Sequence, residues 1–180
     1  RESRICLDIS NQPSSLERPF RATHHSVSTA GLVGGTRHAN PGEISLAHNG
    51  ILFLDELPEF SLATIEALRQ PLETGEIQVT RAEQSHVYPV KFQLVAAMNP
   101  CPCGFKDSID NHCRCSTAAL NRYDTKLSEP LLDRIDLYVQ VKRSRVAEIM
   151  APTTQQATLR AQAKTRVDSA RERQITRQGV

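Results

Sequence analysis

A run of apolar residues that ends in two adjacent carboxylates constrains the fold of this chain more than any other feature. Ile51 to Leu54 form the run, and Asp55 and Glu56 follow it directly. Such a short, continuous run is typical of a strand buried on both faces of a parallel sheet, and open α/β sheets bind ligands at the carboxyl ends of their strands. The sequence therefore predicts an α/β fold with Asp55 and Glu56 at a ligand-binding edge.

Two carboxylates at a strand end suit nucleotide hydrolysis. In the Walker B strand of NTPases, the first carboxylate holds the Mg²⁺ shell and the second orients or deprotonates the attacking water. Asp55 and Glu56 are the candidates for these two catalytic tasks. The alternative is a core strand that simply ends in a polar turn.

A second apolar segment ends in a polar amide. Phe92 to Met98 is followed by Asn99 and then by Pro100. If this segment is a parallel strand of the same sheet, Asn99 lies at the same edge as the two carboxylates. Its amide can then hydrogen-bond the γ-phosphate or the attacking water, and two matched strand ends favour a nucleotide site over an ordinary turn.

Arg134 lies among apolar neighbours in the segment Leu131 to Asp136. Its guanidinium can stabilise a transferring phosphoryl group, because Arg is always charged and offers a rigid fork of donors. It can also form an intramolecular ion pair with Asp133 or Asp136, and these six residues taken alone favour the ion pair.

Six segments carry a further signal through their order along the chain. They are Arg18–Ala22, His24–His25, Pro41–Glu56, Pro58–Phe60, Ala97–Pro100 and Leu131–Asp136. Together they resemble the magnesium-chelatase branch of the AAA+ ATPases, and within that branch the competence-type ComM/YifB proteins. The similarity is continuous over residues 16–142 and weaker in the basic residues that follow.

The resemblance implies a fold and an organisation. Residues 1–142 form a partial AAA+ core with a parallel sheet flanked by helices and a β-hairpin before the sensor strand. Residues 143–180 form a basic linker and the start of a helical lid. ATP and Mg²⁺ are the implied cofactors, a hexameric ring of identical subunits is the implied assembly, and the cytoplasm is the implied location.

The resemblance also assigns roles to the candidate residues. Asp55 and Glu56 are the Walker B pair, with Asp55 on Mg-ATP, and Asn99 is sensor 1. Arg134 is the arginine finger that reaches the nucleotide of a neighbouring subunit.

One motif of the family is missing from these 180 residues. No Gly-x-x-x-x-Gly-Lys-Ser/Thr occurs, so the sequence lacks the Walker A loop whose backbone N–H groups and Lys cradle the phosphates. The nearest match, Gly34-Gly35-Thr36, has no Lys. We interpret the chain as a piece of a longer protein, without Walker A and sensor 2, and expect the piece alone to be inactive.

Two runs of alternating polar and apolar residues predict a β-hairpin. Ile77–Arg81 and His86–Phe92 alternate, and the polar tetrad Ala82–Ser85 separates them. In the resembled clade, such a hairpin projects into a central pore. The candidate contacts with DNA phosphates are Arg81, Gln84 and His86. The alternative is an edge hairpin that fills a subunit interface.

Four of the five cysteines form two Cys-x-Cys pairs on one loop, with His112 beside the second pair. They are Cys101, Cys103, Cys113 and Cys115. Four thiolates are enough to bind a tetrahedral Zn²⁺, although Cys-x-x-Cys is the usual structural spacing. Reduced, unliganded thiols are the alternative. Disulfides conflict with the cytosolic setting that an ATPase implies.

The net charge of +2 gives no nucleic-acid signal by itself, but the basic residues gather near the end of the chain. They are Lys142, Arg143, Arg145, Arg160, Lys164, Arg166, Arg171, Arg173 and Arg177, against Glu148, Asp168 and Glu172. This stretch is either a solvated helix face or a surface for a polyanion. No apolar run approaches the ~20 residues that a membrane helix needs, so we expect no membrane contact.

Three functions fit these features. The first is a motor whose full-length form couples ATP hydrolysis to movement on, or remodelling of, DNA, as in a competence or recombination helicase. The second is an ATPase subunit that drives metal insertion into a tetrapyrrole. The third is a non-enzymatic binding module stabilised by zinc.

Overall fold

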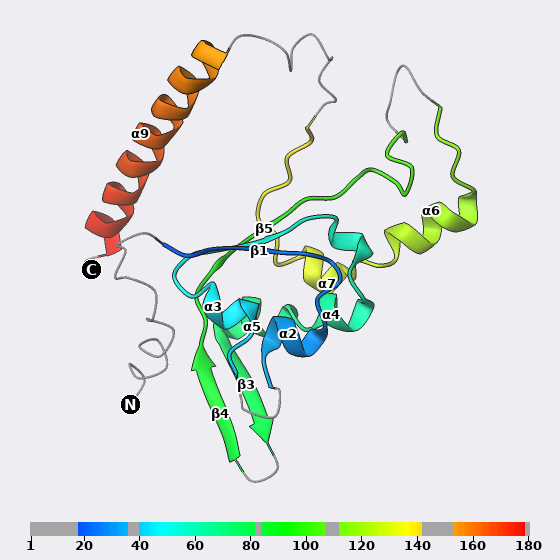
Figure 1. The fold of residues 1–180 in the computed structure, drawn as a ribbon, viewed down its shortest axis with the longest axis horizontal. Coiled ribbons are helices and arrows are strands. Elements are labelled where there is room, and N and C mark those ends of the chain that lie inside the picture. The colour runs from blue at the N-terminus through cyan, green and yellow to red at the C-terminus, as the bar shows by residue number, and fades with distance from the viewer. Residues whose placement is uncertain (1–17, 36–39, 82–83, 107–111, 142–152, 179–180) are drawn as a thin grey trace. The chain divides into compact units, whose positions relative to one another are not determined.

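The computed structural model describes residues 18–35, 40–81, 84–106, 112–141 and 153–178 (Figure 1). Two compact units divide the chain, over residues 1–138 and 139–180. The second unit contains helix α9 (Thr153–Gln178). Among the described helices, none combines the length and the apolar character that crossing a membrane requires.

Three parallel strands form the central sheet of the first unit, in the order β1-β2-β5. They are β1 (Phe20–Thr23), β2 (Ile51–Leu54) and β5 (Gln93–Ala96). The last residues of the three strands, Thr23, Leu54 and Ala96, pair side by side. The carboxyl ends therefore meet at one edge, which confirms the predicted α/β class and the parallel sheet.

Short helices cover one face of this sheet (Figure 1). They are α2 (Thr29–Val33), α3 (Glu43–Leu46), the 3₁₀ helix η1 (Leu57–Glu59), α4 (Leu62–Glu66), α5 (Arg69–Thr74) and α7 (Glu129–Leu132). Their apolar side chains join those of the sheet and of a hairpin in one core. It includes Leu32, Ile44, Leu52, Leu54, Phe60, Ile65, Leu68, Ile77, Val79 and Leu131.

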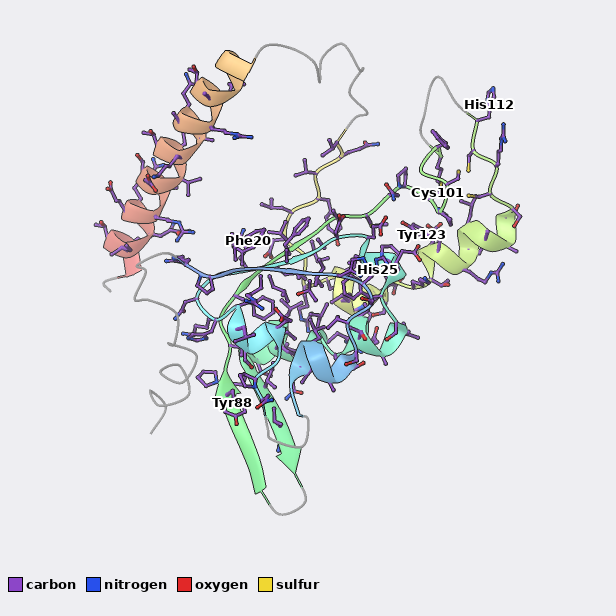
Figure 2. All side chains as sticks on the ribbon, viewed as in Figure 1. Phe20, His25, Tyr88, Cys101, His112 and Tyr123 are labelled. Atoms are coloured by element: carbon purple, nitrogen blue, oxygen red, sulfur yellow. The ribbon has the colours of Figure 1, made fainter. Side chains whose placement is uncertain are left out.

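The other face of the sheet is more open, which corrects one prediction. Leu52 and Leu54 of β2 are fully buried beneath the helices, whereas Ile51 and Phe53 on the opposite face are half-buried. Phe20 stacks on Phe53 there with ring centroids 6.2 Å apart, and it is 62% exposed (Figure 2). The prediction that β2 is buried on both faces is therefore wrong within the described residues. The helices of the described part of the chain pack on one face of the sheet only.

Leu62, Ile65, Leu68 and Leu72 recur at three- and four-residue spacing, which predicts one helix, but the structure divides this segment in two. The first part, α4, begins after the N-cap Ser61, whose hydroxyl accepts a hydrogen bond from the Thr64 N–H. A two-residue turn then leads into α5. Pro71 explains the break, because it has no N–H for the carbonyl four residues earlier and its ring crowds that carbonyl.

A β-hairpin directly precedes β5, as predicted. Its strands are β3 (Glu76–Arg81) and β4 (Gln84–Pro89), and it projects from the helices and sheet of the first unit (Figure 1). Arg81 pairs with Gln84, which leaves two residues for the turn. The expected four-residue turn over 82–85 is therefore wrong, since Gln84 and Ser85 extend the ladder.

Candidate nucleotide site

The carboxyl end of β2 presents the two predicted carboxylates to solvent. Asp55 and Glu56 follow the strand directly, and both are exposed. Glu56 has a left-handed backbone conformation, with φ of 52°, which is uncommon for a residue with a side chain. Its N–H donates to Oδ1 of Asp55 at 2.9 Å. This turn redirects the chain at the strand end and leaves both carboxylates accessible.

Asn99 follows β5 at the same edge. The Leu57 N–H donates to the Ala97 carbonyl at 2.9 Å and so ties the segment after β2 to the segment after β5. The Asn99 side chain is exposed, while its backbone carbonyl accepts a hydrogen bond from the Tyr123 hydroxyl at 3.0 Å. Burial, with a smaller effect from the Glu59 carboxylate, raises the pKa of the Tyr123 hydroxyl.

A histidine with no role assigned from the sequence lies against Glu56. His25 follows β1, and its Nδ1 is 3.2 Å from Oε2 of Glu56. Its ring centroid lies 4.0 Å from that of His24 and 6.4 Å from that of Phe60, which it meets edge-on. His25 can therefore hold the Glu56 carboxylate in position. The available sequence signal was its place, just past the end of a strand in the same sheet.

Arg134 lies just beyond α7, which Leu131 anchors in the core. Its Nη2 is 3.0 Å from Oε1 of Glu73, with side chains 37% and 59% exposed respectively. An intramolecular ion pair therefore forms, but with Glu73 of α5 rather than with Asp133 or Asp136. Exposed ion pairs contribute about 0–1 kcal/mol, so Arg134 can exchange Glu73 for another anion at little cost.

The three candidate DNA contacts lie near the end of the hairpin. The backbone register pairs Arg81 with Gln84 and Val79 with His86, so all three candidates fall in the last three paired steps before the turn. Residues 82–83 lie outside the described part of the chain.

The four loop cysteines converge, with all four Sγ atoms within 4.8 Å of one another. Backbone N–H groups of Arg114 and Phe105 lower the pKa of Cys103 to about 6. The side-chain hydrogen bond between Cys115 and Cys103, together with burial, raises the pKa of Cys115 to about 12. His112 is exposed and is not part of this thiol group (Figure 2). Cys6 lies outside the described residues.

The sheet edge carries exposed carboxylates that can act as ligands of a cation. Carboxylate oxygens are hard ligands of the kind that Mg²⁺ prefers, and Mg²⁺ is usually bound by one or two of them together with substrate phosphates. In the described part of the chain, Asp55 accepts a hydrogen bond only from its neighbour's N–H. Its oxygens are therefore available to a cation, and the residues present fit Mg²⁺.

Residues 3–149 match a protein-family model described as magnesium chelatase, subunit ChlI. The chain is 49% identical over 181 residues to the uncharacterized protein YifB of Escherichia coli, covering 98% of this chain and 35% of that protein. It is 48% identical over 163 residues to the competence protein ComM of Haemophilus influenzae, covering 91% and 31%. The chain thus spans about a third of the length of these relatives.

Among solved structures, NtrX from Brucella abortus in complex with ADP is similar to this chain with a TM-score of 0.45. The sequence identity is 17%, and the match covers 66% of this chain and 24% of NtrX.

Proposed function

This chain belongs to the magnesium chelatase family, and we propose that its full-length protein is an ATPase that couples ATP hydrolysis to movement on, or remodelling of, DNA. The observation that carries the ATPase part is the convergence of Asp55, Glu56 and Asn99 on one edge of a parallel sheet. The DNA part is supported by the likeness to ComM, whose name assigns it to competence.

In this proposal each residue has one task at the sheet edge. Asp55 binds the Mg²⁺ of Mg-ATP, and Glu56, with His25 beside it, orients or deprotonates the attacking water. Asn99 hydrogen-bonds the γ-phosphate or that water. The ion that Asp55 would hold would supply positive charge against the negative charge that develops on the transferring phosphoryl group. The Walker A loop that cradles the phosphates has no counterpart in these 180 residues, so it would come from elsewhere in the protein.

The proposed assembly is a hexameric ring in the cytoplasm, where ATP and DNA are both present. In such a ring, Arg134 gives up its exposed ion pair with Glu73 and reaches the nucleotide of the next subunit. Its rigid, permanently charged fork suits the charge on a transferring phosphoryl group.

A second candidate is an ATPase subunit for metal insertion into a tetrapyrrole, which the name of the matched family supports. The two candidates differ in what should accelerate hydrolysis. DNA should stimulate ATP hydrolysis by a DNA motor. A chelatase subunit should instead respond to its partner subunits and a porphyrin. Steady-state ATP hydrolysis by the full-length protein, with and without DNA, distinguishes them, and absence of hydrolysis altogether favours a binding module.

Arg81→Ala in the full-length protein is expected to weaken DNA binding and DNA-stimulated hydrolysis while leaving basal hydrolysis near its native level. Loss of one phosphate contact should weaken binding to all sequences alike and reduce the salt slope of the affinity by about one. Binding measured at several salt concentrations checks this.

Arg69→Ala is the matched control for Arg81→Ala, because Arg69 is exposed and pairs with Glu66 at 3.0 Å. It should leave the salt slope unchanged. If Arg81→Ala keeps DNA binding but dissociates the ring, the hairpin fills a subunit interface instead.

A further inference from the structure

Three of the four clustered thiols have the sulfur–sulfur spacing of a tetrahedral metal site, and Sγ of the fourth, Cys115, lies within 4.8 Å of the others. Sγ of Cys101 lies 3.4 Å from that of Cys103 and 3.7 Å from that of Cys113, and the latter two are 3.6 Å apart. Zn–S bonds of about 2.3 Å place the sulfurs of a regular tetrahedron ~3.8 Å apart. All four cysteines are free, so no disulfide competes for these thiols.

The backbone around the first pair overcomes the unfavourable Cys-x-Cys spacing. The Gly104 N–H donates to the Cys101 carbonyl at 2.9 Å, and Gly104 adopts φ of 76°, which a residue with a side chain rarely takes. After this turn, backbone N–H groups of Phe105 and Arg114 reach Sγ of Cys103. Such N–H groups are what the longer Cys-x-x-Cys spacing normally supplies to a thiolate.

Among the described residues, the hydrophobic core does not extend to the segment that carries these cysteines. Within the described residues, the core cluster and its partly buried neighbours include Leu94 and then Leu127, with no member between them. Cys101 and Tyr123 are the only buried residues in the described parts of the segment 97–126. Segments that cannot bury enough apolar surface are commonly held by disulfides or a structural metal, and here the thiols are unpaired.

We propose that Cys101, Cys103, Cys113 and Cys115 bind one Zn²⁺ ion as thiolates. Four sulfur ligands in a tetrahedral arrangement suit Zn²⁺ or iron. A closed set of four protein ligands, with no position left for water or substrate, is the arrangement of structural zinc sites. The thiols release their protons to solvent as the metal binds.

From this position the ion would hold Asn99 in place. The functional part of this inference rests on the proposed ATPase activity. Asn99 precedes Cys101 by two residues. On the other side, Cys115 leads into helix α6 (Thr117–Asp124), whose Tyr123 donates to the Asn99 carbonyl at 3.0 Å. With the ion bound, the metal, α6 and this hydrogen bond would close a loop of chain on Asn99. Zinc then fixes the residue that faces the γ-phosphate.

Elemental analysis of the full-length protein, purified under reducing conditions, should find about one Zn²⁺ per chain. Cys103→Ser should lose it, because one missing thiolate opens the site. Cys6→Ser, the same change at the cysteine outside the cluster, should keep it. In the native protein, a strong chelator should remove the metal and added Zn²⁺ should restore it. Native protein that contains iron, or no metal, overturns the proposal.

Hydrogen exchange without nucleotide tests the link to Asn99 independently of hydrolysis. Zinc removal and Tyr123→Phe should each speed amide exchange in residues 97–105 and leave β1 and α4 unchanged, while Tyr123→Phe retains its zinc. Tyr138→Phe is the control, since it removes a similar hydroxyl bond, to the Leu132 carbonyl at 2.8 Å. Unchanged exchange in 97–105 after zinc removal overturns the link. Absence of ATP hydrolysis in zinc-loaded protein with protected residues 97–105 counts against the proposed function alone.

Discussion

Changing Glu56 to Gln in the full-length protein is expected to leave ATP binding near its native level and to lower turnover by roughly 10² to 10⁴. Gln has nearly the same size and can still hydrogen-bond to water, but it lacks the charge that orients or deprotonates the attacking water. Calorimetry with ATP and Mg²⁺ measures the binding, and steady-state hydrolysis measures the turnover.

Glu59→Gln supplies the matched control, because Glu59 is a neighbouring exposed carboxylate whose Oε2 lies 4.0 Å from Nζ of Lys126. The same substitution there should change turnover only a few-fold. If Glu56→Gln also keeps turnover within a few-fold of native, the carboxylate has no part in hydrolysis. The apolar strand and its two acids would then be a structural feature of the sheet.

The sheet and its edge could be predicted because their signals are local. The run from Ile51 to Leu54 is long enough for one strand, and the carboxylates stop it abruptly. The segment before Asn99 repeats this pattern, and parallel strands bring their carboxyl ends together whatever the loops between them do. The hairpin could be predicted for the same reason, because its two alternating runs are close in sequence.

Pairings between distant residues could not be predicted in this way. His25 and Glu56 are 31 positions apart, and Arg134 and Glu73 are 61 apart. For Arg134, the neighbouring Asp133 and Asp136 were the expected partners. In the structure, Arg134 lies just beyond α7 and pairs with Glu73 of α5 instead. Charged residues have many candidate partners along a chain, and only tertiary packing selects among them.

The helix over residues 62–72 was predicted wrongly because two local signals conflict there. Apolar spacing favoured a single helix over residues 62–72, although Pro71 was already visible and breaks it. For the four loop cysteines, the Cys-x-Cys spacing fits zinc less well than Cys-x-x-Cys, and zinc binding stays a prediction. The structure adds that the amides reaching Cys103 come from Phe105 and from Arg114 across the loop. The Arg114 amide is 11 positions from Cys103 in the sequence and comes close to it only in the folded structure.

Arg134→Ala in the full-length protein should keep the affinity for ATP and lower turnover by roughly 10³ to 10⁵, the range in which arginine fingers act. The physical reason is that a fixed positive fork stabilises the transition state and contributes little to the ground state. Equilibrium ATP binding and steady-state hydrolysis test the two halves of this expectation, and ring assembly is monitored alongside.

Two variants separate this role from the ion pair with Glu73. Arg134→Lys keeps the charge but loses the fork, so it should be nearly as inactive as Arg134→Ala if the side chain acts on a phosphoryl group. Glu73→Ala removes only the partner and should leave turnover near native. Equal losses in Glu73→Ala and Arg134→Ala would assign Arg134 to the stability of its own chain.

Mixed rings decide whether Arg134 acts on a neighbour. Rings of Arg134→Ala subunits alone, or of Glu56→Gln subunits alone, should be inactive, because every interface lacks one of the two groups. In a mixture, some interfaces pair an intact Glu56 with the intact Arg134 of the next subunit, and part of the activity should return. If mixed rings assemble but recover nothing, either Arg134 serves its own chain or hydrolysis requires every interface at once. Arg134→Lys distinguishes these outcomes, because an exposed ion pair with Glu73 tolerates the change and a finger on a phosphoryl group does not.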